Sequence, residues 1–113
     1  MIHECNNEGD FRRLVENSNG RMVFLFKHST NCPISRGAWE RFSAFTEQHP
    51  EIEYWRVLVG DHKDLSTYIA EKTDISHQSP QVILFHEGKA VWKCAHHSIT
   101  EANIRRQLER LAG

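Results

Sequence analysis

The segment MVFLFKHSTNCPIS, residues 22–35, decides the fold. Its first five residues, 22–26, are continuously apolar and rich in residues that favour β structure, which predicts a strand covered on both faces. From Pro33 onward the apolar residues recur at helical spacing: Ile34, Ala38, Phe42 and Phe45. This pattern predicts a helix that ends before Pro50, since the residue before a proline disfavours helical geometry. A buried strand therefore leads through a short loop into a helix that starts at Cys32.

Outward from this segment, helical and strand patterns alternate along the chain. Strand patterns occupy residues 52–59, 81–85 and 89–93, and helical patterns occupy residues 6–17, 65–72 and 98–111. The last two strand patterns are separated by a short segment that contains Gly88, which predicts a tight hairpin. The expected order is helix, strand, helix, strand, helix, hairpin, helix.

This order predicts an α/β fold with a mixed central sheet flanked by helices on both faces. A strand–helix–strand crossover produces parallel neighbours, whereas a tight hairpin is antiparallel. The outline is that of a thioredoxin-like fold. A chain of 113 residues can build one hydrophobic core, so we expect residues 1–113 to form a single domain.

Composition restricts the classes of function. The chain has 14 Lys+Arg and 15 Asp+Glu, a formal net charge of -1, so it has no excess positive charge for a nucleic acid or a membrane surface. The N-terminal residues are polar, and no apolar run approaches the ~20 residues of a membrane span. We expect a cytoplasmic protein without a nucleic-acid or membrane partner. Its three cysteines are odd in number and cannot form a self-contained disulfide framework.

Cys32 is the candidate for chemistry. In open α/β sheets the site lies beyond the carboxyl ends of the strands, where loops lead into helix N-termini. With Pro33 as the first helical residue, Cys32 becomes the N-cap and faces the free amides of the first turn. These amides favour an anion, so we expect Cys32 to react as a thiolate.

The spacing of Cys32 and Ser35 corresponds to a redox Cys-x-x-Cys motif in which serine replaces the second cysteine. Ser35 could donate a hydrogen bond to the thiolate, but it cannot close an internal disulfide. The site therefore favours exchange through one thiol.

Two segments together resemble the thioredoxin superfamily and, more closely, the YtxJ-type monothiol bacilliredoxins. They are residues 26–35, FKHSTNCPIS, and residues 77–81, HQSPQ. The resemblance covers nearly the whole chain. It departs from the family at Asn31, where the family usually has threonine.

The resemblance implies a function and a set of site residues. The protein would remove bacillithiol, or a similar low-molecular-weight thiol such as glutathione, from S-thiolated client proteins without a cofactor. Cys32 would be the nucleophile, assisted by Ser35, and Pro80 would be a cis-proline beside it. The neighbouring residues would contact the substrate: Asn31, Pro33, Ser79 and Gln81.

The other cysteines differ in their expected roles. Hairpin register places Cys94 opposite Gln81 or Val82, so it is a candidate resolving cysteine, although a lone cysteine at a strand end is more often a packing residue. We expect Cys5 to lie near a mobile terminus as an exposed thiol that has no functional role.

Two alternatives belong to other classes of function. Soft zinc or copper ligands are available in His28, His96 and His97 together with Cys32 and Cys94, but their spacing is not that of an established metal motif. We therefore expect no metal site. The second alternative is a noncatalytic interaction module that keeps the fold and has an inert Cys32.

Overall fold

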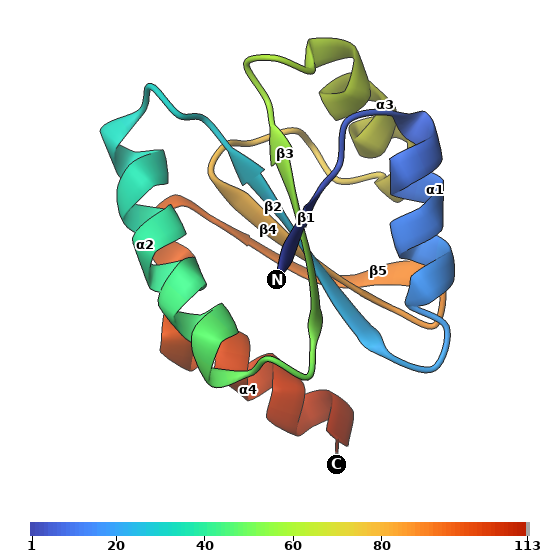
Figure 1. Ribbon diagram of the computed structural model, residues 1–113, viewed down its shortest axis with the longest axis vertical. Helices are drawn as coiled ribbons and strands as arrows, with labels where there is room; N and C mark the ends of the chain where they lie inside the picture. Colours follow the sequence, from blue (N-terminus) through green and yellow to red (C-terminus); the bar gives the residue numbers. More distant parts are fainter. Residues whose placement is uncertain (113) are drawn as a thin grey trace.

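The computed structural model describes residues 1–112 and contains one five-stranded sheet with helices on both sides (Figure 1). The strands are β1 (Ile2–Glu4), β2 (Met22–His28), β3 (Glu53–Leu58), β4 (Gln81–His86) and β5 (Lys89–Ala95). The helices are α1 (Glu8–Asn17), α2 (Pro33–Gln48), α3 (Lys63–Thr73), a 3-10 turn at His96–Ser98 and α4 (Glu101–Ala112).

The sheet is mixed, as predicted, with strand order β1-β3-β2-β4-β5. The central strand β2 pairs parallel with β3 and antiparallel with β4, and it is buried from Val23 to His28. Its continuous burial explains its continuous apolar sequence, because both faces of the strand are covered. The β4–β5 hairpin turns through Glu87 and Gly88, both of which have positive φ.

The first strand was missed by the sequence analysis, which expected the chain to begin with a helix. β1 pairs parallel with β3, with Ile2 opposite Tyr54, and the backbone N–H of Cys5 continues this edge by donating to the Arg56 carbonyl at 2.7 Å. Three residues on a sheet edge are too short to show alternation, and they are held by backbone hydrogen bonds that leave no trace in the side-chain pattern.

Each face of the sheet carries its own core. One core lies under α1 and α3 and includes Phe11, Leu25 and Ile69. The other lies under α2 and α4 and includes Phe42 and Ile104. The two pairs of helices lie on opposite sides of the sheet in Figure 1, which confirms the predicted layers.

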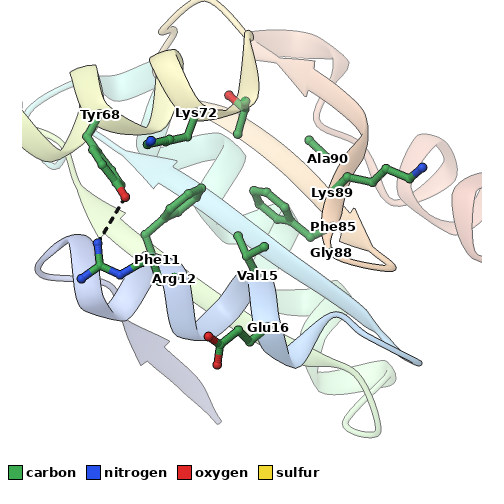
Figure 2. A pocket seen from close by; sticks show the side chains of 11 residues that line it. Phe11, Arg12, Val15, Glu16, Tyr68, Lys72, Phe85, Gly88, Lys89 and Ala90 are labelled. Atoms are coloured by element: carbon green, nitrogen blue, oxygen red, sulfur yellow. Dashed lines mark hydrogen bonds between the residues drawn. The ribbon is translucent and has the colours of Figure 1, made fainter.

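A pocket of about 510 Å³ opens on the face that carries α1 and α3 (Figure 2). Its floor is aromatic, with Phe11 packed edge-on against Phe85 at 5.7 Å between ring centroids. At its rim the Arg12 guanidinium donates to the Tyr68 hydroxyl at 3.3 Å. None of the predicted site residues lines this pocket.

Candidate functional site

Cys32 is the N-cap of α2, in the loop that follows the carboxyl end of the central strand β2. Its backbone is extended, its N–H donates to the Ser29 carbonyl at 3.2 Å, and its carbonyl accepts the Arg36 N–H at 3.0 Å. Pro33 follows as the first helical residue, as predicted. The Cys32 side chain makes no capping hydrogen bond, and the residue is half-buried.

Ser35 is fully buried in the first turn of α2. Its Oγ accepts a hydrogen bond from the Ser29 N–H at 2.9 Å and lies 2.7 Å from Nδ1 of His28. Ser35 therefore ties the end of β2 and the loop after it to the helix that carries Cys32.

His28 is a residue whose place in the site the sequence analysis missed, because it considered this histidine only as a metal ligand. The imidazole stacks on Trp39, with 5.5 Å between ring centroids and an interplanar angle of 21°. The Arg56 guanidinium lies over the Trp39 ring, with 4.9 Å from its Cζ to the ring centroid, and forms a salt bridge with Glu4. Burial and, second, the Arg56 charge lower the pKa of His28, which favours the neutral imidazole.

The segment around Pro80 lies at the start of β4. The Ser79–Pro80 peptide bond is cis, and the Pro80 carbonyl accepts the His96 N–H at 3.0 Å. The Ser79 Oγ is buried without a hydrogen-bond partner among residues 1–112. Asn31 is exposed in the loop before Cys32.

Gln81 uses its side chain inside the protein. Its Oε1 accepts a hydrogen bond from the buried ammonium of Lys27 at 2.9 Å, and its Nε2 donates to the Ser76 carbonyl at 3.3 Å. Burial lowers the pKa of Lys27 to about 8. This pair joins the residue after Pro80 to the strand that leads to Cys32. The sequence shows only an isolated lysine at the end of an apolar run, so Lys27 was missed.

Cys94 pairs with Val82, as the hairpin register predicted. It is half-buried and packs against the core under α2 and α4. Burial raises the pKa of the Cys94 thiol to about 12, which keeps it protonated at neutral pH.

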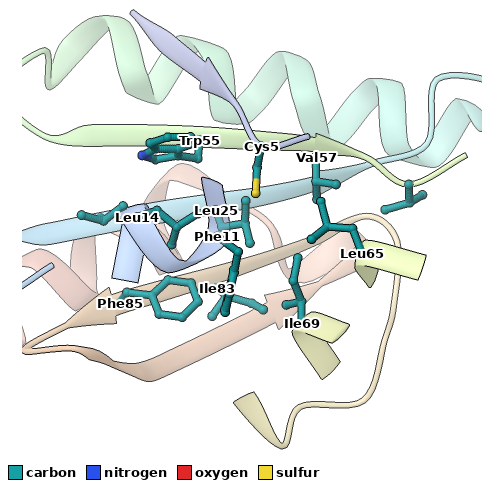
Figure 3. Close-up of a cluster of buried hydrophobic side chains, with 12 residues drawn as sticks. Cys5, Phe11, Leu14, Leu25, Trp55, Val57, Leu65, Ile69, Ile83 and Phe85 are labelled. Atoms are coloured by element: carbon teal, nitrogen blue, oxygen red, sulfur yellow. The ribbon is translucent and has the colours of Figure 1, made fainter. Parts of the chain in front are cut away.

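Cys5 is fully buried, so the expectation of an exposed thiol at a mobile terminus was wrong. Figure 3 shows its side chain inside the cluster that includes Leu25 and Val57. Burial and, second, the nearby charge of Asp10 raise the pKa of Cys5 to about 12. The burial follows from β1, which holds the preceding residues against β3.

All three cysteines are free thiols. In residues 1–112, no group of three or more His, Cys, Asp or Glu side chains is arranged to hold a metal ion. The helices of the same residues include none that is long and apolar enough to cross a membrane.

The fold and the geometry at Cys32 define a class of protein: a thioredoxin-fold protein with a single cysteine in its Cys-x-x-Ser motif. The family model described as "Monothiol bacilliredoxin BrxC" matches residues 3–104. The chain therefore belongs to the monothiol bacilliredoxin family, as the resemblance of its motifs indicated. It is a thiol-disulfide oxidoreductase.

Solved structures agree with this assignment. A protein described as a candidate oxidoreductase with a thioredoxin fold is 31% identical, with a TM-score of 0.85 over 93% of this chain and 91% of its own. Fasciola hepatica thioredoxin has 19% identity and a TM-score of 0.76, covering 96% and 97% of the two chains. Trypanosoma brucei brucei thioredoxin has 13% identity and a TM-score of 0.79, covering 99% and 91%. The two thioredoxins show the fold alone.

Proposed function

We propose that the protein removes bacillithiol from mixed disulfides with client proteins in the cytoplasm. The observation that carries the proposal is the contrast among the cysteines. Cys32 lies half-buried at a helix N-terminus without a side-chain hydrogen bond, whereas burial keeps Cys5 and Cys94 protonated. Membership of the monothiol bacilliredoxin family supports bacillithiol as the thiol.

The proposed step is a thiol-disulfide exchange. The Cys32 thiolate attacks the bacillithiol sulfur of the mixed disulfide, and a new S–S bond forms as the original one breaks. The client cysteine leaves as a thiolate and is protonated by solvent. Bacillithiol remains on Cys32, so the client cysteine is restored without net change in the number of disulfides.

The site residues have separate proposed roles. Cys32 is the nucleophile, and the amides of the first turn of α2 favour its thiolate. Ser35 supports the thiolate through its hydroxyl, and Pro80 faces the substrate with its neighbours. The proposed substrate-contacting residues are Asn31, Pro33, Ser79 and Gln81. Because the Gln81 side chain bonds Lys27 and Ser76, we assign its substrate contact to its backbone.

Regeneration requires a second thiol, because Ser35 has no sulfur. Cys94 is the internal candidate, but its raised pKa leaves little thiolate at neutral pH. We therefore propose that an external low-molecular-weight thiol regenerates Cys32 and that Cys94 contributes only when the Cys32 segment moves toward it.

The test uses client proteins that carry either bacillithiol or glutathione on one cysteine. Intact masses of client and enzyme are followed together, with the wild-type protein and with Cys94→Ser. We expect bacillithiol to leave the client and appear on the enzyme, more rapidly than glutathione and in both proteins. Transfer of neither thiol, or equal transfer of both, would overturn the bacillithiol assignment. An internal disulfide in the wild-type protein would instead make Cys94 the resolving cysteine.

A further inference from the structure

The Ser35 hydroxyl has two hydrogen-bond partners, and the direction of one of these bonds depends on the tautomer of His28. Its Oγ accepts the Ser29 N–H at 2.9 Å and lies 2.7 Å from Nδ1 of His28. A hydroxyl offers one proton and two acceptor lone pairs, and Ser29 occupies one of these lone pairs. The protonation of His28 Nδ1 then decides where the hydroxyl proton points.

Two arrangements satisfy the pair formed by His28 and Ser35. When Nδ1 carries no proton, it accepts the hydroxyl proton of Ser35. When Nδ1 carries the proton, it donates to Oγ, both lone pairs are filled, and the hydroxyl proton must find another acceptor. Cys32 is the N-cap residue and Ser35 the third residue of the helix, two positions that approach each other at a helix N-terminus, and the Cys32 sulfur makes no capping hydrogen bond. A thiolate there would be a strong, charged acceptor.

The surroundings of His28 hold its ring in place. His28 is 5% exposed, and its ring stacks on Trp39 and meets Phe26 edge-on, with 5.7 Å between ring centroids. The charged groups on the neighbouring strands are Arg56 on β3, which lies over Trp39, and Glu4 on β1, which is paired with Arg56. A buried ring beside a positive charge favours the neutral imidazole, so the choice lies between its two neutral tautomers.

We propose that His28 is a positioning residue for Cys32. With its proton on Nδ1, His28 donates to the Ser35 Oγ and thereby directs the Ser35 hydroxyl proton toward the Cys32 sulfur. This arrangement stabilises the thiolate over the thiol. The inference deepens the proposed function, on which it rests, by assigning a role to a residue outside the Cys-x-x-Ser motif.

Two variants separate positioning from packing. His28→Phe keeps a ring that can stack on Trp39 but has no nitrogen, whereas His28→Asn loses the ring and keeps an N–H donor near the place of Nδ1. The readout is the rate of iodoacetamide alkylation of Cys32 against pH. We expect His28→Phe to raise the pH midpoint by about one unit, about a tenfold slower reaction at neutral pH, and His28→Asn to stay near wild type. A packing role predicts the opposite order, which would overturn the proposal.

The same measurement in a Ser35→Ala background tests whether His28 acts through Ser35. We expect the effect of His28→Phe to disappear there, and an unchanged effect would contradict the proposal. Long-range ¹H–¹⁵N NMR of the wild-type protein provides a second test that does not depend on variant folding. At a pH where Cys32 alkylates at its full rate, Nδ1 should be protonated, and a bare Nδ1 would also overturn the proposal. None of these readouts involves bacillithiol, so failure of this inference and failure of bacillithiol transfer can be distinguished.

Discussion

Cys5 and Cys32 occupy equivalent places in the chain and differ in nearly every property that controls reactivity. Each follows a strand and precedes a helix: Cys5 lies between β1 and α1, and Cys32 lies between β2 and α2. Cys5 is fully buried two residues before the N-cap of its helix, which is Asn7. Cys32 is itself the N-cap and is half-buried.

The first turns of the two helices also differ in charge. α1 begins with Glu8 and Asp10, and the Asp10 charge contributes to the raised pKa of Cys5. The first turn of α2 contains no acidic residue. A position between strand and helix therefore does not by itself account for the reactivity that we propose for Cys32. The proposal also depends on the cap position, the partial exposure of the residue and the absence of an acidic residue from the first turn of α2.

The largest expected effect is on exchange itself. Cys32→Ser should reduce transfer of bacillithiol from a client protein to the uncatalysed rate, because no other thiol in residues 1–112 combines exposure with a helix N-terminus. Cys5→Ala should retain transfer within about twofold, since its sulfur is buried. Full activity of Cys32→Ser would contradict the proposed difference in reactivity between the two strand–helix junctions, β1–α1 with Cys5 and β2–α2 with Cys32.

For the free energy of unfolding, we expect substitution of Cys5 to have the larger effect and substitution of Cys32 the smaller one. Cys5→Ser puts a hydroxyl into the core under α1 and α3 and should lower the free energy of unfolding by about 2 kcal/mol. Cys32→Ser at the cap should change it by less than about 0.5 kcal/mol, because serine is a good N-cap residue. Urea unfolding measures both, and equal losses would show that the two sites have similar packing.

Lys27 lies on β2, the strand that leads to Cys32, and its burial should make the free energy of unfolding depend on pH. Its pKa is about 8 in the folded protein and near 10.5 when unfolded, so between these values the unfolded state binds more protons and stability rises with pH. Relative to Lys27→Met, the wild-type protein should gain about 2 kcal/mol between pH 8 and pH 10. A difference that stays constant or declines over this range would exclude a buried ammonium at Lys27.

The smallest effect tests the charge of the first turn. Ile34 is 44% exposed in the first turn of α2, so Ile34→Glu would give this helix an acidic residue comparable to those of α1. We expect alkylation of Cys32 at neutral pH to slow about threefold at low salt and to recover at high salt. Ile34→Gln is the matched uncharged control. Equal rates for the two variants would show that first-turn charge does not distinguish the junctions.

The Cys32 junction was predictable from sequence because its signals are local. The apolar run of β2 and the proline after Cys32 lie within fourteen residues of sequence, 22–35, and the Cys94 register follows from a short hairpin. The Cys5 junction was not predictable, because its burial depends on a three-residue strand that pairs with β3 some fifty residues later. Lys27 and Gln81 likewise meet across 54 positions, and no pattern in either segment indicates the pairing.

Competitive alkylation of the native protein tests the central claim most directly. The protein is treated at neutral pH with a limiting amount of isotope-coded iodoacetamide, denatured and labelled with the second isotope. Peptide mapping then gives the fraction of native labelling at each cysteine. The account predicts that nearly all native label lies on Cys32, with Cys5 and Cys94 labelled only after denaturation. Native labelling of Cys5 or Cys94 at a rate comparable to that of Cys32 would contradict it.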